Sequence, residues 1–116
     1  MVIVVDDDEA VRDSLSVMLS LAGLSVRTCD SGAALLILLE NATPDCLIVD
    51  LHMPGMNGLE LIGRLNGSRP AIPTILVSGN LEPKTEAEAM RLGVLHMLKK
   101  PFSGTALIDV VQGIVG

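Results

Sequence analysis

The feature that most constrains the fold of this chain is the regular alternation of short apolar runs with segments of helical periodicity. The apolar runs predict five strands, at about 1–6, 24–29, 45–50, 73–78 and 94–98. The segments between them predict helices that end before Gly23, cover about 32–41, open at Asn57-Gly58, and cover about 83–92 and 103–115. Strands and helices that alternate in this way form a parallel sheet with helices on both faces and right-handed crossovers.

Length and composition predict one compact domain over residues 1–116. The chain has 116 residues and no internal linker, which suits one domain and is too short for two. Apolar residues make up 49% of it, but Phe102 is its single aromatic residue. The core must therefore consist of aliphatic side chains, as in buried parallel strands. Pro70 and Pro73 are expected to flank the start of the fourth strand.

Charge and hydropathy argue against two classes of partner. The net charge of −6 does not favour nucleic-acid binding, which needs a basic face. No apolar run approaches the 18 residues of a membrane span, and no charged segment precedes the first strand as in a signal peptide. Cys29 and Cys46 are too few for a disulfide framework, and we expect them to be reduced and buried. These observations predict a cytoplasmic domain.

Polar residues stand where the predicted strands end. Asp6, Asp7 and Asp8 follow the first strand, and Asp50 closes the third. Ser78-Gly79 ends the fourth, and Lys99-Lys100 ends the fifth. Because parallel strands present their C-terminal ends at one edge of the sheet, where open α/β sheets bind ligands, we expect a site there.

The residue types at this edge predict a phosphoryl site with a divalent cation. Asp8 suits the N-cap of the first helix, but that role does not explain Asp6 and Asp7, which would repel Asp50. A hard cation such as Mg²⁺ relieves such repulsion and is commonly held by one or two carboxylates plus a phosphate. The Ser78 hydroxyl and the Lys100 ammonium can each bind a phosphoryl oxygen.

Four stretches stand in order along the whole chain, at residues 4–12, 48–58, 74–79 and 99–102. Together they resemble the receiver domain of two-component response regulators. The resemblance implies a doubly wound, five-stranded parallel sheet of order 2-1-3-4-5, the CheY-like or flavodoxin-like three-layer αβα fold.

The resemblance also implies a metal site around a modified aspartate. Asp50 matches the phosphoacceptor that becomes 4-aspartylphosphate, and Asp6 and Asp7 match the acidic pair at the metal, with Asp7 as direct ligand. His52 matches the position whose backbone carbonyl binds the metal, so its imidazole would face the rim of the pocket. The implied cofactor is Mg²⁺ or Mn²⁺.

Further matches concern the switch that relays phosphorylation. Ser78 matches the switch hydroxyl, Lys100 the active-site lysine, and Lys100–Pro101 a bond that is usually cis in the family. The chain departs from the family at Met97, where an aromatic residue or histidine is usual. Strand alternation directs the neighbouring His96 to the opposite face.

The implied function is a phosphoacceptor signalling switch rather than a metabolic enzyme. Asp50 would take a phosphoryl group from the phosphohistidine of a sensor histidine kinase or phosphotransfer protein, or from a small phosphodonor. His52 and Asn80 would tune the lifetime of the phosphate. The resemblance also implies an output domain or partner and a homodimer through the fourth helix, fifth strand and fifth helix. A stand-alone regulator, a transcription factor and a hybrid kinase all remain open as contexts.

Three other interpretations are weaker. An aspartyl phosphatase of the haloacid-dehalogenase type places a second acid two residues after the nucleophile, where this chain has His52. A flavin-binding protein would need a phosphate loop rich in Ser or Thr and an aromatic residue to stack on the ring. A degenerate receiver used only for docking is favoured by Met97 but opposed by the complete acidic set with Ser78 and Lys100.

Overall fold

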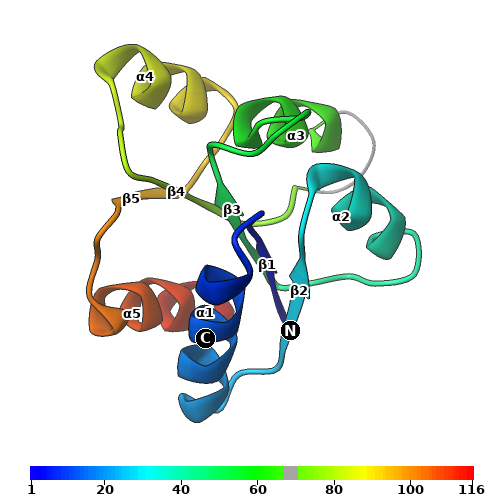
Figure 1. Ribbon diagram of the computed structural model, residues 1–116, viewed down its shortest axis with the longest axis vertical. Coiled ribbons are helices and arrows are strands. Elements are labelled where there is room, and N and C mark those ends of the chain that lie inside the picture. The colour runs from blue at the N-terminus through cyan, green and yellow to red at the C-terminus, as the bar shows by residue number, and fades with distance from the viewer. Residues whose placement is uncertain (67–70) are drawn as a thin grey trace.

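The computed structural model describes residues 1–66 and 71–116, in which five strands alternate with five helices (Figure 1). Each predicted element is present and lies within about three residues of its expected bounds, the largest difference being at the end of α2, which stops at Leu38 rather than near 41. Pro70 lies outside the described residues. The elements are β1 (Val2–Val5), α1 (Glu9–Leu21), β2 (Val26–Cys29), α2 (Gly32–Leu38), β3 (Cys46–Asp50), α3 (Gly58–Leu65), β4 (Thr74–Ser78), α4 (Pro83–Arg91), β5 (His96–Lys99) and α5 (Gly104–Val115).

The strands form one parallel sheet in the order β2-β1-β3-β4-β5, as predicted. Helices α1 and α5 cover one face, and α2, α3 and α4 cover the other (Figure 1). The strand order reverses between β1 and β3, and open α/β sheets bind ligands beyond the strand ends at such a point. Val5 of β1 is in register with Val49 of β3, so the residues that follow them, Asp6 and Asp50, lie side by side.

The core is aliphatic on both faces of the sheet. In β1, Val2 and Val4 pack with residues of α1 and α5, whereas Ile3 and Val5 pack with residues of α2 and α3. Every residue of β1, β3 and β4 is buried, which explains their continuous apolar sequences. A third cluster lies between the sheet and helices α3 and α4, and its partly buried members include Met97 of β5.

Side-chain caps fix where the helices begin. The Asp8 carboxylate accepts hydrogen bonds from the backbone N–H groups of Ala10 and Val11 at the start of α1, as predicted. The Ser31 hydroxyl likewise accepts from Ala34 N–H at the start of α2. Asn57 forms a capping box with Glu60 at the start of α3. These caps therefore define where the connections that follow β1, β2 and β3 end and the next helices begin.

The two cysteines are free thiols, as predicted. Strand β1 lies between them, and Cys29 is in register with Val5 whereas Cys46 is in register with Val2 at the opposite end of the strand. Burial, reinforced by the charge of Asp45, raises the pKa of the Cys46 thiol to about 11. Burial also raises the pKa of Cys29.

Over residues 1–66 and 71–116, the helices are all too short or too polar to cross a bilayer.

Candidate metal and phosphoacceptor site

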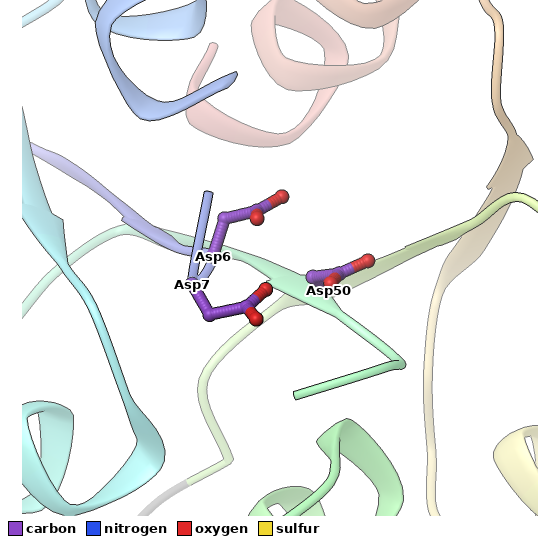
Figure 2. A group of neighbouring side chains, drawn as sticks. All are labelled: Asp6, Asp7 and Asp50. Carbon is purple, nitrogen blue, oxygen red and sulfur yellow. The ribbon is translucent and has the colours of Figure 1, made fainter. Parts of the chain in front are cut away.

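Three carboxylates meet at the C-terminal edge of the sheet. Asp6 and Asp7 follow β1, and Asp50 is the last residue of β3 (Figure 2). One oxygen from each lies within 4.8 Å of the others. Asp6 and Asp50 are 1% and 5% exposed, whereas Asp7 is exposed to solvent. The cluster is thus two buried acids with a third at its open side.

Lys100, which follows β5, reaches both buried acids. Its Nζ donates to Oδ2 of Asp6 at 3.1 Å and to Oδ1 of Asp50 at 3.3 Å. The backbone holds it there, because its N–H donates to the carbonyl of Ser78 at 2.7 Å across β4 and β5. The Lys100–Pro101 bond is cis, as expected. Residues nearly a hundred positions apart therefore form one charged cluster.

Burial and charge act in opposite directions on the ionisation of this cluster. Burial, reinforced by the charge of Asp6, raises the pKa of Asp50 above its ordinary value, although Lys100 opposes the shift. Burial also works to lower the pKa of Lys100, but the hydrogen bond to Asp6 and the charge of Asp50 outweigh it and raise that pKa. The lysine therefore stays charged, while Asp50 carries a charge that its surroundings disfavour.

This imbalance predicts that Asp50→Asn stabilises the fold at neutral pH by about 1 kcal/mol in metal-free buffer. A carboxyl whose pKa is raised by folding costs stability when ionised and costs nothing once it is protonated in both states, below about pH 4. The difference between the variant and the parent should therefore shrink as the pH falls from 7 to 4. Urea unfolding at several pH values measures it, and a variant less stable than the parent at pH 7 would contradict the prediction.

The carboxylates fit a hard divalent cation. Carboxylate oxygens are ligands that Mg²⁺ prefers, and the exposed Asp7 leaves the cluster open on one side. The buried position of Asp50 would strengthen its attraction for such a cation. The acidic triad of Asp6, Asp7 and Asp50 is thus consistent with a metal site.

The other predicted residues lie near this edge, but their contacts differ. Ser78 is fully buried, and its hydroxyl donates to the carbonyl of Asn80 at 2.9 Å and accepts from Asn80 N–H at 3.1 Å. It is thus engaged in a local turn, whereas Lys100 bonds the acids directly. His52 and Asn80 are exposed. The proposed roles of these residues stay predictions.

Met97 lies apart from the acids, on the face of the sheet covered by α3 and α4. It packs against a buried cluster that includes Leu51, the residue directly after Asp50, and Ala89 of α4. His96 is exposed, in keeping with strand alternation. A methionine in this cluster can change rotamer as its neighbours move, because its side chain is unbranched and flexible.

Sequence reasoning missed two contributors to the site. Arg12 on α1 donates from Nη1 to the backbone carbonyl of Asp6 at 2.8 Å. Gly58, the first residue of α3, packs so closely that a Cβ atom there would lie 2.6 Å from the carbonyl oxygen of Asp50. Both contacts are to backbone atoms, so no pattern of side-chain chemistry indicates them.

Comparison with known proteins agrees with this geometry. The response regulator receiver domain family matches residues 2–112. The transcriptional regulatory protein FixJ of Bradyrhizobium diazoefficiens is 34% identical over 112 residues, which cover 97% of this chain and 55% of that protein. The DNA-binding transcriptional regulator NtrC of Escherichia coli is 35% identical over 109 residues, covering 94% of this chain and 23% of NtrC. The chain thus spans only part of these longer regulators.

Solved structures show the same fold over almost the whole chain. A response regulator receiver protein from Pseudomonas putida superposes with a TM-score of 0.92 at 30% identity, covering 97% of this chain and 94% of the other. The crystal structure of FixJ-N gives a TM-score of 0.88 at 35% identity, covering 96% and 89%. With its doubly wound sheet and its acidic triad at the strand ends, the chain belongs to the response regulator receiver domain family, whose members are signalling phosphoacceptors rather than enzymes.

Proposed function

We propose that residues 1–116 form one receiver domain that accepts a phosphoryl group on Asp50 in a Mg²⁺-dependent reaction. The observation that carries the proposal is a buried carboxylate at a strand end, with two acids within 4.8 Å and the Lys100 ammonium 3.3 Å away. This arrangement supplies a nucleophile, oxygen ligands for a cation and a fixed positive charge.

In the proposed reaction, a carboxylate oxygen of Asp50 attacks phosphorus and the bond from phosphorus to the donor breaks. The leaving nitrogen of a phosphohistidine keeps the electron pair of that bond. When bound, Mg²⁺ neutralises charge that builds up on the phosphoryl oxygens. Asp7, Asp6 and the His52 carbonyl would hold it. Lys100 would exchange its bond to Asp50 for one to a phosphoryl oxygen.

Ser78 has a defined change to make in this scheme. Its hydroxyl donates to the Asn80 carbonyl, so it must release that bond before it can donate to a phosphoryl oxygen. The release would alter the turn after β4, which leads into α4. We propose that this change, with repacking around Met97, alters the signalling surface.

We propose that this domain is cytoplasmic and that its phosphodonor is a sensor histidine kinase or phosphotransfer protein. The FixJ and NtrC relatives extend well beyond the matched region, which supports an output domain as the receiver of the signal. Homodimerisation through α4, β5 and α5 stays a prediction.

The test is phosphorylation of the purified domain by acetyl phosphate with and without Mg²⁺, followed by intact-mass measurement. We expect one acid-labile phosphoryl group in the presence of Mg²⁺ and little without it. Asp50→Asn should abolish the adduct while the variant remains folded. No adduct on the folded parent domain would overturn the proposal. Steady turnover of a small phosphoester, with no adduct, would favour a phosphatase instead.

A further inference from the structure

The two acids that follow β1 are consecutive, so one peptide unit joins the backbone positions from which their side chains project. That unit is planar, and its orientation depends on what holds the Asp6 carbonyl and the Asp7 N–H. The Asp6 carbonyl accepts a hydrogen bond from Nη1 of Arg12 at 2.8 Å. A bond from a charged donor at this distance is among the stronger kinds. Arg12 therefore restrains the orientation of the Asp6–Asp7 peptide.

The geometry of α1 explains why Arg12 reaches this carbonyl. Asp8 caps the helix, and the N–H of Arg12 donates to the Asp8 carbonyl at 3.0 Å in the first helical turn. Helical side chains tilt toward the N-terminus of their helix. A long side chain in the first turn thus extends back over the end of β1. This hydrogen bond ties the first turn of α1 to the backbone directly after β1.

Other hydrogen bonds hold the rest of Asp6. Its N–H donates to the Cys29 carbonyl at 3.1 Å, which continues the pairing of β1 with β2. Its Oδ1 accepts from Asp8 N–H at 2.9 Å, and its Oδ2 accepts from Lys100 at 3.1 Å. Asp6 is therefore a buried anchor. Asp7 is exposed, so its direction depends on the peptide that joins it to this anchor.

We propose that Arg12 is a positioning residue that fixes the Asp6–Asp7 peptide and so presets the Asp7 carboxylate for a divalent cation. The inference rests on the proposed function, because it assigns a role in binding the Mg²⁺ required there. Partners that orient a metal ligand in this way commonly contribute ten-fold or more to metal affinity.

The charge of Arg12 alone predicts the opposite change in Mg²⁺ affinity, so the direction of the change distinguishes the two explanations. Arg12 places a positive charge beside the acidic cluster, and that charge repels Mg²⁺. If Arg12 acted through its charge alone, removing it would tighten Mg²⁺ binding. If it positions Asp7, removing it weakens binding.

The experiment is calorimetric titration with Mg²⁺ of the parent, Arg12→Met, Arg12→Lys and the control Arg27→Met. Arg27 is an exposed residue of β2, so its variant removes the same charge away from the acids. We expect Arg12→Met to raise the Kd about ten-fold. Arg12→Lys keeps a charged donor and should recover most of the affinity, and Arg27→Met should match the parent.

Urea unfolding without metal, run on the same proteins, separates positioning from general loss of stability. A purely structural role would lower stability but leave the Kd of the folded protein unchanged. An Arg12→Met Kd equal to or below that of the parent overturns the inference. If that variant does not fold, Arg12→Gln is titrated in its place with the same expectation. A parent that binds no Mg²⁺ would instead overturn the proposed function.

Discussion

Replacing Lys100 by methionine is expected to lower the free energy of unfolding by about 2 kcal/mol at pH 7 in metal-free buffer. The change leaves the buried carboxylates of Asp6 and Asp50 without the cation that lies 3.1 and 3.3 Å from them. Removing one partner of a buried ion pair lowers stability by more than an exposed ion pair contributes, because the remaining charge is still kept away from water. The expected cost is smaller than the roughly 3–5 kcal/mol lost when a fully buried ion pair is broken, because the Lys100 side chain remains 28% exposed.

Two conditions should reduce this deficit, and both follow from its cause. The pKa of Asp50 is raised, so as the pH falls to about 4 this carboxyl becomes protonated and no longer needs the missing cation. At neutral pH, saturating Mg²⁺ should restore part of the stability, because the ion supplies positive charge to the same acids and binds only the folded state. Urea unfolding at pH 7 and pH 4, with and without Mg²⁺, measures both effects.

The control for Lys100 is its neighbour Lys99→Met. Lys99 ends β5 and is exposed, so losing its charge should change stability by less than about 0.5 kcal/mol. A Lys100→Met deficit of equal size at pH 7 and pH 4 would contradict the electrostatic explanation. It would point instead to lost packing of the lysine stem.

The second large effect concerns Gly58→Ala, which should destabilise the fold by about 2 kcal/mol. A Cβ atom at this position would lie 2.6 Å from the carbonyl oxygen of Asp50 and 3.0 Å from the Cα of Leu51. Both are backbone atoms at the end of a buried strand, so neither can move without displacing Asp50. We therefore also expect slower phosphorylation by acetyl phosphate.

The same helix contains a matched control. Gly63 of α3 is exposed, and a Cβ atom there would meet nothing within 4 Å. Because alanine favours a helix more than glycine does, Gly63→Ala should stabilise the fold by about 0.5–1 kcal/mol. One substitution type thus has opposite signs at two positions of one helix. Equal effects at both positions in urea unfolding would show that close approach to Asp50 does not matter.

The fold could be predicted because its signals are local and repeated. Alternating periodicity places the elements, and cap residues such as Asp8 and Ser31 mark where helices begin. The meeting of Asp6 with Asp50 follows from parallel pairing, which brings residues after neighbouring strands together. These inferences need only the order of elements and the direction of the strands.

The remaining features depend on tertiary distances that no sequence pattern carries. Residue types suggest that Ser78 and Lys100 both face the site, yet Lys100 bonds the acids and the Ser78 hydroxyl bonds the turn at Asn80. The role of Arg12 was missed because its partner is a backbone carbonyl. In the sequence, Gly58 is an ordinary residue at the start of a helix, and only the structure shows how close its Cα lies to the Asp50 carbonyl.

The burial of both thiols makes the protein suitable for site-selective labelling. Only a thiolate reacts readily with maleimides and similar reagents, and a pKa of about 11 gives Cys46 a far smaller thiolate fraction at pH 7 than an exposed cysteine has. Burial also hinders access of reagents to Cys29. A cysteine introduced at an exposed position of α4 or α5 can therefore carry a fluorophore or spin label with both native thiols in place. Such a probe would report movement of these helices in an otherwise unaltered domain.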